Sequence, residues 1–291
     1  MPTENFPSNW GRWGADDQIG AVNLIGPEAR ARGVLQVRTG RAVSLARATR
    51  SSSLLSIPML PPGQPAGAVQ TAMFYTGADP VAMGELMVLP THHRDITHLD
   101  ALSHFVTDGK VYPGVPQPES TTPMGVRHGA ADVFADGILT RGVLLDLAPG
   151  GSLPDGHAIT AGDLAAAAER AGVEVEEGDA IVVRGGWDTV TEFGRPLPGM
   201  TADAVRWMHD HGIALYAGDV GDAMPPLDDE VPGALHVLAL GRLGIPLIDG
   251  ADPEALAAAC AEQGRHTFML VVAVPRILGT TGMIVNPLAI F

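Results

Sequence analysis

Short apolar runs rich in β-branched residues recur along the chain and constrain its fold more than any other feature. Runs of this length between turn residues are typical of strands. They cover Ala42–Ala46, Leu86–Leu89, Gly142–Leu147, Ala180–Arg184, Ile213–Ala217, Ile245–Ile248 and Phe268–Val274. The sequence therefore predicts a fold built around a β-sheet.

Helical segments stand between several of these runs in the second half, and three of them carry start and stop signals. Thr160 and Asp163 resemble a capping box before Leu164–Ala171, and Gly172 is placed to end that helix. The other two are Ala202–His211, with Thr201 as the cap and Met200 and Val205 as a hydrophobic staple, and Ala255–Gln263, preceded by Asp252-Pro253. Alternating strands and helices predict an α/β fold.

The whole chain, residues 1–291, is expected to form one domain with a mixed sheet and surrounding helices. The Pro- and Gly-rich stretch Pro58–Gly67 resembles a linker, but motifs on both sides favour a surface loop or lid. Pro113–Pro123 is predicted to be a second such loop.

Charge and composition exclude several classes of partner. Lys and Arg total 18 against 33 Asp and Glu, a formal charge of -15, so the surface field repels nucleic acid and anionic lipids. The most apolar run, Phe268–Val274, is far shorter than the ~20 residues of a membrane helix, and the amino terminus lacks the pattern of a signal peptide. We therefore expect a cytoplasmic protein that binds a small molecule.

Cys260 is the only cysteine, which excludes an intramolecular disulfide and a thiolate zinc cluster. Any metal site must then use histidine and carboxylate ligands. Cys260 itself lies in an Ala-rich stretch and is predicted to be a small buried side chain without a chemical role.

The densest group of coordinating side chains lies between residues 91 and 104. In an extended segment His98 and Asp100 point to one face, and His104 can join them from the next turn. An imidazole beside a carboxylate suits a divalent cation. A hydrogen-bonded structural network of the same three side chains is the alternative, and spacing alone does not decide between them.

At this point the sequence resembles the cyclase superfamily, which includes bacterial kynurenine formamidase and isatin hydrolase. Its pattern His-x-Gly-Thr-His-x-Asp-x-Pro-x-His is matched by Thr97, His98, Asp100 and His104. Five further segments also resemble family members, in the same order along the chain: Trp10–Asn23, Asp108–Gly114, Gly178–Trp187, His236–Asp249 and Pro275–Ile290. The resemblance implies a swivelling β/β/α fold with a barrel-like mixed sheet.

The chain departs from this pattern at its first histidine, where Arg94 stands. An arginine has no lone pair to donate, so it cannot be a metal ligand. Arg94 is either a catalytic clamp for a substrate carboxylate or oxyanion, or an ion-pair partner of Asp95 or Asp100. The missing ligand is supplied by His92 or His93, or the metal is held by fewer residues or lost.

The resemblance also implies roles for residues elsewhere in the chain. His236 and Asp249 are expected to be metal ligands together with His98 and Asp100, and His104 to be catalytic. Trp13, which composition alone would place in the core, is implied to be an aromatic wall for the substrate. The implied cofactor is a divalent metal, Zn or Mn, and the implied assembly is a homo-oligomer, a dimer or tetramer.

The implied activity is metal-dependent hydrolysis of a C–N bond in a lactam, an isatin-like ring or an aryl formamide, with a lactone as a close variant. Two alternatives use the same scaffold. One is a metal-free cyclase or isomerase that relies on His104, Asp100 and Arg94. The other is a non-catalytic protein that binds a small ring compound.

Overall fold

The computed structural model describes residues 2–53, 67–77, 79, 81–188, 191–192, 194–228 and 230–291. The loop predicted at Pro58–Gly67 lies outside these residues except for Gly67. The helices are α1 (Pro27–Val34), α2 (Gln117–Ser120), α3 (Ala161–Ala171), α4 (Ala202–Asp210), α5 (Glu254–Gln263), the 3-10 turns η1 (Pro2–Asn5), η2 (Gly20–Leu24) and η4 (Ala131–Phe134), and the π-helix η5 (Leu235–Leu243).

The strands fall into one large sheet and several small ones. The large sheet contains β1 (Ala42–Ser44), β5 (His98–Asp100), β10 (Ile138–Asp146), β12 (Ala180–Arg184), β14 (Leu215–Gly218), β15 (Leu247–Asp249), β16 (Thr267–Val272), β17 (Gly282–Ile284) and β18 (Leu288–Ile290). The small sheets contain β2 (Ser51–Ser53), β3 (Val69–Tyr75), β4 (Met83–Val88), β6 (Lys110–Val111), β7 (Val115–Pro116), β8 (Thr121–Thr122), β9 (Gly125–Val126), β11 (Ala158–Ile159) and β13 (Gly199–Met200).

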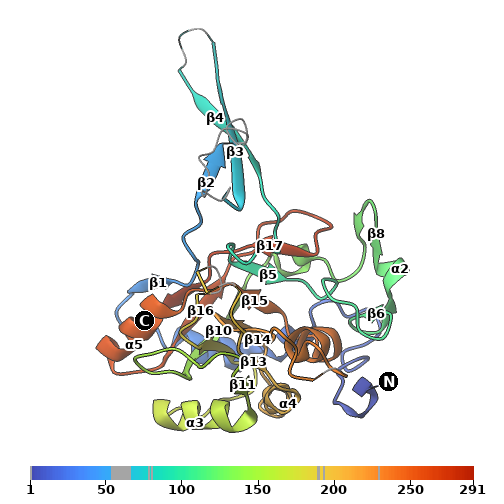
Figure 1. Cartoon of the computed structure of the whole chain (residues 1–291), viewed down its shortest axis with the longest axis vertical. Coiled ribbons are helices and arrows are strands. Elements are labelled where there is room, and N and C mark those ends of the chain that lie inside the picture. The colour runs from blue at the N-terminus through green and yellow to red at the C-terminus, as the bar shows by residue number, and fades with distance from the viewer. Residues whose placement is uncertain are drawn as a thin grey trace.

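The large sheet has the strand order β1-β18-β16-β10-β12-β14-β15-β5-β17 and curls into an open half-barrel (Figure 1). Its central strands β10, β12, β14 and β15 run parallel. The flanking strands on both sides pair antiparallel. This mixed α/β architecture confirms the fold class expected from the sequence.

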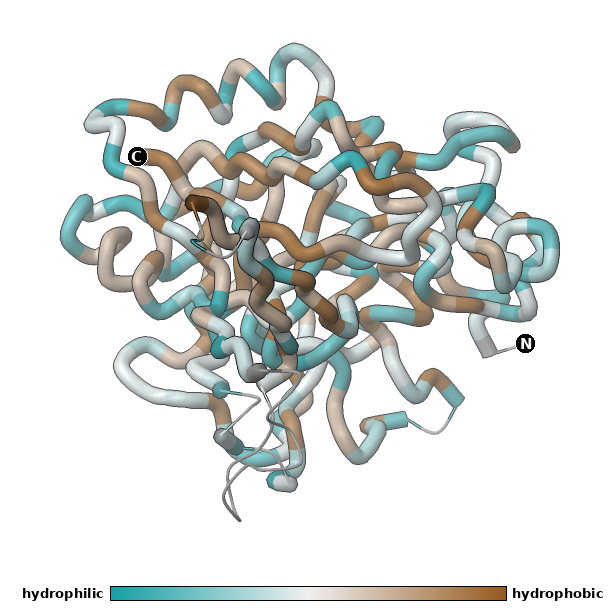
Figure 2. The backbone as a smooth tube through the Cα atoms, turned by 90° about the horizontal axis from the view of Figure 1, so that it is seen from above, coloured by the Kyte–Doolittle hydropathy of each residue, from teal (hydrophilic) through white to brown (hydrophobic). Residues whose placement is uncertain are grey.

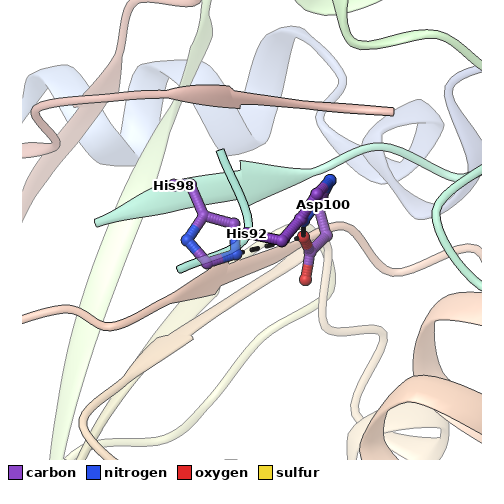
Figure 3. A group of neighbouring side chains, drawn as sticks. All are labelled: His92, His98 and Asp100. Atoms are coloured by element: carbon purple, nitrogen blue, oxygen red, sulfur yellow. Dashed lines mark hydrogen bonds and ion pairs between the residues drawn. The ribbon is translucent and has the colours of Figure 1, made fainter. Parts of the chain in front are cut away.

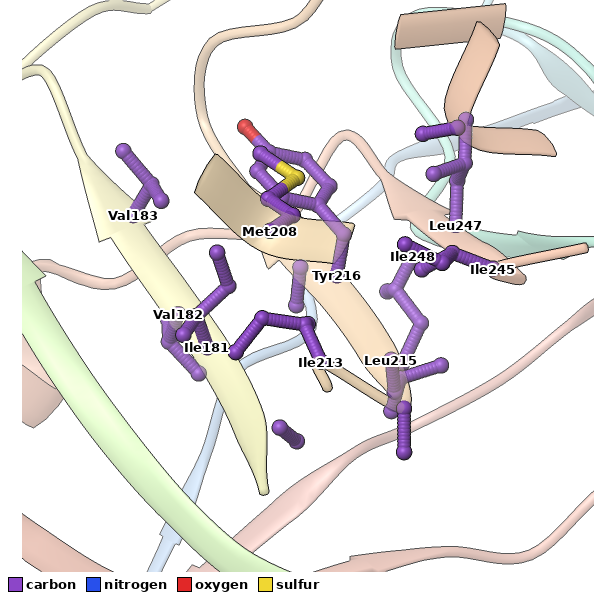
Figure 4. Close-up of a cluster of buried hydrophobic side chains, with 14 of the residues drawn as sticks. Ile181, Val182, Val183, Met208, Ile213, Leu215, Tyr216, Ile245, Leu247 and Ile248 are labelled. Carbon is purple, nitrogen blue, oxygen red and sulfur yellow. The ribbon is translucent and has the colours of Figure 1, made fainter. Parts of the chain in front are cut away.

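Burial explains why the parallel strands occupy the centre. Every residue of β12 and β14 is buried, as parallel strands covered on both faces require. Figure 4 shows their side chains packed with those of β15 and with Met208 from α4. In Figure 2 hydrophobic and hydrophilic residues alternate along the outer helices, which therefore bury only one face.

The three predicted helices are present, and their predicted caps are largely confirmed. Thr160 and Asp163 form the capping box of α3, and Gly172 ends that helix with a φ of +63°. Thr201 caps α4 by accepting a hydrogen bond from the Ala204 amide. The cap of α5 differs from the prediction, because the helix begins at Glu254 with Pro253 at the N-cap and without a side-chain cap, although the Asp252 carboxylate accepts from the Glu254 amide at 3.3 Å. No helix in the described ranges is both long enough and apolar enough to span a bilayer.

One predicted strand lies outside the large sheet. The run Leu86–Leu89 belongs to β4, which pairs with β3, while β3 pairs with β2. In Figure 1 these three strands project as an arm from one end of the body. We call them the arm below. After β4 the chain re-enters the body and reaches β5.

Candidate metal centre

Strand β5 presents two of the predicted site residues on one face of the sheet. His98 pairs with Asp249 of β15 across the ladder, so these residues and Asp100 face the same side. Thr97 anchors the start of the strand, because its hydroxyl donates to the Gly250 carbonyl at 2.7 Å. The alternation predicted for His98 and Asp100 is confirmed.

The Asp100 carboxylate is fully buried, and four imidazoles surround it. His92 Nδ1 lies 2.8 Å from Oδ1, His98 Nε2 3.4 Å from Oδ1, His104 Nε2 3.9 Å from Oδ1, and His236 Nε2 3.4 Å from Oδ2. Figure 3 shows the rings of His92 and His98 beside this carboxyl group. Two overlapping sets of these side chains could hold a metal ion. One set is His92, His98 and Asp100, and the other is Asp100, His104 and His236.

His92 joins the group, although the resemblance assigns the first histidine position of the pattern to residue 94. Its Nδ1 donates to Asp100, and its Nε2 lies 3.0 Å from the Thr281 hydroxyl. The ring fits only because residue 282 is glycine, since a Cβ there would stand 2.6 Å from His92 Cε1. Adjacent His93 instead accepts a hydrogen bond from the Asp95 amide at 3.1 Å.

The tautomer of His98 follows from its backbone contact. Its Nδ1 lies 2.8 Å from the Ile96 carbonyl, which can only accept a hydrogen bond. Nδ1 therefore carries a hydrogen and Nε2 faces Asp100, so that the neutral form of the ring would direct the Nε2 lone pair there. This is the orientation that a metal-ligating histidine needs.

His236 is oriented in the same way by a carboxylate. Its Nδ1 donates to Asp222 Oδ2 at 2.7 Å, and its Nε2 lies 3.4 Å from both Asp100 Oδ2 and Asp249 Oδ2. Asp222 also accepts the backbone amide of Leu235 at 2.7 Å, at the start of η5. A π-helix often marks a functional site, and here it carries His236 between three carboxylates.

The pKa values reflect this concentration of negative charge. Burial alone would lower the pKa of His236, but Asp100, Asp222 and Asp249 outweigh burial and raise it well above its ordinary value. Burial alone would raise the pKa of Asp100, but the neighbouring imidazoles of His236, His92 and His98 hold it well below its usual range. The field at Nε2 of His236 therefore favours a cation.

His104 behaves differently from the other histidines. Burial, together with the nearby rings of His92 and His236, lowers the pKa of His104 to about 4 despite the opposing charge of Asp100. Its side chain is 25% exposed and stacks on His92 with ring centroids 3.8 Å apart. His104 is thus neutral near pH 7 and reachable from solvent.

The arrangement fits a divalent cation. Asp100 Oδ2 is buried and lacks a hydrogen bond in the part of the chain that the structure describes. Three 3.4 Å separations join His98 Nε2 to Asp100 Oδ1, and His236 Nε2 to Asp100 Oδ2 and to Asp249 Oδ2. They exceed ordinary hydrogen-bond lengths but match the about 3.3 Å between ligand atoms of a tetrahedral zinc with ~2.0 Å bonds. Imidazole and carboxylate donors are the types that such a cation prefers.

The structure brings five of the seven predicted residues into one group. His98, Asp100, His104, His236 and Asp249 form one group. Arg94 lies on the surface. Trp13 packs against the core, with the guanidinium of Arg12 4.7 Å from its ring centroid.

Two residues near the group were missed by the sequence analysis. Asp222 follows β14 at the carboxyl end of a parallel strand, where sites in α/β folds often lie, and that position was a usable signal. Phe105 lies 5.4 Å from the His236 ring and 6.4 Å from the His104 ring between centroids, and no sequence pattern marked it. A cavity of about 480 Å³ lies between α3 and α5, and neither Asp222 nor Phe105 lines it.

Comparisons with known proteins agree on one family. Residues 43–223 match the family model described as "Putative cyclase". A crystal structure of a protein described as a novel cyclase is 30% identical, with a TM-score of 0.80 over 98% of this chain and 100% of that one.

Isatin hydrolases share the fold at lower identity. Isatin hydrolase A from Labrenzia aggregata, bound to benzyl benzoate, is 20% identical, with a TM-score of 0.61 over 86% of this chain and 93% of its own. Isatin hydrolase A from Ralstonia solanacearum is 17% identical, with a TM-score of 0.59 over 86% and 91%. A search of curated proteins finds no match.

Proposed function

The chain belongs to the cyclase family, and on that premise we propose that it is a metal-dependent hydrolase that cleaves the C–N bond of a cyclic amide or an aryl formamide. The observation that carries this proposal is the buried carboxylate of Asp100, ringed by imidazoles and with one oxygen lacking a hydrogen bond. A purely structural network would satisfy that oxygen.

The residues that would hold the cation are His98, Asp100, His236 and Asp249, with His92 in reach. A divalent cation, Zn or Mn, supplies Lewis-acid chemistry, because it polarises a carbonyl and makes water acidic near neutral pH. The chain's own contribution is orientation: the Ile96 carbonyl and the Asp222 carboxylate hold His98 and His236 with Nε2 facing Asp100.

His104 is the proposed proton carrier. Because the pKa of its ring is lowered to about 4, His104 is neutral near pH 7, and Nε2 can accept a proton from the attacking water. The same atom then gives that proton to the departing nitrogen. Arg94, whose side chain is exposed, is proposed to meet a substrate carboxylate or oxyanion.

An aromatic substrate is favoured by the surroundings of His104. The ring of Phe105 is tilted beside His236 and edge-on to His104, where a planar aryl group could stack. The structurally similar isatin hydrolases take their name from a substrate with such a ring. We therefore place isatin-like lactams and aryl formamides first, with Trp13 as a proposed further wall and a lactone as a close variant.

The experiment combines metal analysis with turnover. Protein purified without added metal is assayed against isatin, a simple lactam, an N-formylaniline and an aryl lactone, with and without a chelator. We expect bound Zn or Mn in the wild-type protein, loss of hydrolysis in chelator, and recovery when the metal is returned. Asp100→Asn should lose both metal and turnover, whereas Asp203→Asn at the start of α4 should keep both.

Two outcomes separate the alternatives. Full activity in chelator with no bound metal would support a metal-free cyclase or isomerase that uses His104, Asp100 and Arg94. Binding of a ring compound without turnover, unchanged by His104→Ala, would support a non-catalytic binding protein. Either result contradicts the hydrolase proposal.

A further inference from the structure

The two helices that flank the cavity between α3 and α5 face it with small side chains. Apart from one charged residue on each helix, every lining residue of the two helices is an alanine: Ala167 and Ala171 of α3, and Ala257, Ala258 and Ala261 of α5. Spacings of three and four residues place each set on one face of its helix. Helix axes pack about 8–10 Å apart depending on the side chains in contact, so two alanine faces could approach closely. Here they leave a cavity of about 480 Å³ between them.

The large sheet supplies the floor of this cavity. Leu144 and Asp146 are two residues apart on β10 and therefore point to the same face, and Arg184 of β12 pairs with Asp146 in the parallel ladder. On the outer side Ala258 and Ala261 are exposed, so the cavity opens to solvent between the helices. Its size falls within the roughly 300–1,000 Å³ of small-molecule pockets. The cavity thus has apolar walls and charged groups at its floor.

Arg184 holds the charged end of the cavity in shape. Its side chain is 8% exposed, and its guanidinium donates to both carboxylate oxygens of Glu254 at 2.8 and 3.1 Å and to Asp146 Oδ1 at 2.9 Å. The backbone carbonyls of Ala148 and Gly151 accept two further hydrogen bonds at 2.7 and 3.2 Å. All five N–H groups of Arg184 are therefore engaged. Arg184 ties the start of α5 to the sheet and has no donor left for a ligand.

Arg170 and Asp146, which also line the cavity, keep charged atoms available beside Arg184. Among the described residues the Arg170 guanidinium makes a single hydrogen bond, from Nη2 to the Asp146 backbone carbonyl at 2.8 Å. The Asp146 carboxylate accepts from the Ala148 amide and from Arg184 through Oδ1 alone, and no contact in the described ranges uses Oδ2. A guanidinium and a carboxylate oxygen therefore remain for a ligand, and the Arg170 hydrogen bond keeps them close together.

A ligand that complements this lining carries both charges and an apolar body. An anion alone would meet the Asp146 carboxylate and a cation alone would meet Arg170, whereas a zwitterion suits both. We propose that the cavity between α3 and α5 binds a free α-amino acid with an apolar side chain. Arg170 holds its carboxylate, Asp146 Oδ2 holds its ammonium group, and the two alanine faces hold its side chain. This site is distinct from the metal cluster, because no residue of the cluster lines the cavity.

The first test locates binding by NMR, with isotope-labelled alanine methyl groups as reporters. The protein is titrated with L-phenylalanine, with and without a chelator, because an amino acid can also bind a metal ion directly. The methyl resonances of Ala171 and Ala261 should shift along the same saturable curve in both conditions. The absence of a saturable shift, or a shift that disappears in chelator, overturns the proposal.

The second test asks whether both charges of the ligand are recognised. Phenylpropionate lacks the ammonium group and phenethylamine lacks the carboxylate, so each should bind about 10- to 100-fold more weakly than L-phenylalanine, the loss expected for a hydrogen bond to a charged group. Arg170→Gln should weaken the binding of L-phenylalanine to a similar extent but should not weaken that of phenethylamine. Arg30→Gln, at an exposed position of α1 that does not line the cavity, is the control and should change neither. Equal affinities for the three ligands, or an equal loss of both ligands in Arg170→Gln, contradict the proposed contacts.

The third test fills the cavity. Ala258→Phe adds a ring to one wall, whereas Ala255→Phe adds the same ring at an exposed position of α5 that does not line the cavity. The first variant should lose L-phenylalanine binding with unchanged circular dichroism, and the second should bind like the wild type. Binding that survives Ala258→Phe, or that is lost equally in Ala255→Phe, would overturn this position for the ligand. None of these readouts involves bound metal or turnover, so they fail separately from the proposed hydrolase function.

Discussion

The carboxylate of Asp222 accepts the Nδ1 hydrogen of His236 at 2.7 Å, and this contact turns the Nε2 of the ring toward Asp100. The same carboxylate accepts the backbone amide of Leu235. One side chain therefore sets both the start of η5 and the direction of a candidate metal ligand. Contacts of this kind fix the tautomer of a ligating histidine and raise its basicity.

Replacing Asp222 by Asn should weaken metal binding while the fold persists. Asn keeps only one acceptor oxygen, so its NH2 group would face either the His236 Nδ1 hydrogen or the Leu235 amide, and it lacks the negative charge. We expect metal affinity to fall roughly 10- to 100-fold, as measured by competition with a chromogenic chelator. Asp203→Asn is the matched control, and an equal loss in that variant would contradict the orienting role of Asp222.

Adding a methyl group at Gly282 should displace His92. The new Cβ would stand 2.6 Å from His92 Cε1 and 2.7 Å from the Leu99 carbonyl oxygen. We expect Gly282→Ala to lower metal affinity and the thermal midpoint, whereas Gly26→Ala, which meets open space, should change neither. A double variant, Gly282→Ala with His92→Ala, separates the two contacts. It removes the clash with the His92 ring but keeps the clash with the Leu99 carbonyl oxygen. If the ring is not involved, the two substitutions will be additive.

His104 and His98 should differ in what their removal abolishes. His104→Ala should retain metal but lose turnover by about 10²- to 10⁴-fold, the usual contribution of a positioned proton carrier. His98→Ala should lose metal as well, because its Nε2 is directed at Asp100. Elemental analysis and steady-state kinetics check both, with His211→Ala, whose ring stacks on Trp207, as the control. Equal metal loss in both variants would make His104 a ligand.

The stability of the chain should fall as the buried Asp219 ionises. Burial raises the pKa of Asp219 to about 6, although the Gly185 and Trp187 amides donate to its carboxylate at 2.7 and 3.0 Å. The folded-state pKa is thus above the unfolded value, so the contribution of Asp219 to stability is full below pH 3.8 and declines as pH rises through about 6.

Denaturant unfolding of the wild type and Asp219→Asn, measured from pH 4 to pH 7.5, tests this behaviour. The free energy of unfolding of the wild type relative to the variant should decrease with pH by on the order of 3 kcal/mol. The variant lacks the titrating group and provides the baseline. A difference that is flat, or that grows with pH, would show that Asp219 does not titrate as described.

Much of the local structure was predictable because it depends on neighbouring residues. Alternation along 98–100 put His98 and Asp100 on one face, and Thr160 with Asp163 marked the start of α3. The run Leu86–Leu89 was correctly predicted as a strand, but the same apolar pattern does not reveal that the strand stands exposed in the arm. Side chains alternate between the two faces of a strand with the same two-residue period, whether the residues that pack on those faces belong to the same chain or not.

The sequence by itself determined several strands of the sheet, three of the helices, and the placement of His98 and Asp100 on one face with His104 near them. Only the tertiary structure decided that His92 takes the place beside Asp100, that Asp222 orients His236, and that Gly282 leaves room for a ring. The physical reason is the separation along the sequence of the residues that interact. Strand alternation and helix caps are set by backbone geometry over a few residues, whereas the contact between His92 and Thr281 joins positions 189 residues apart and exists only once β5 and β17 have paired.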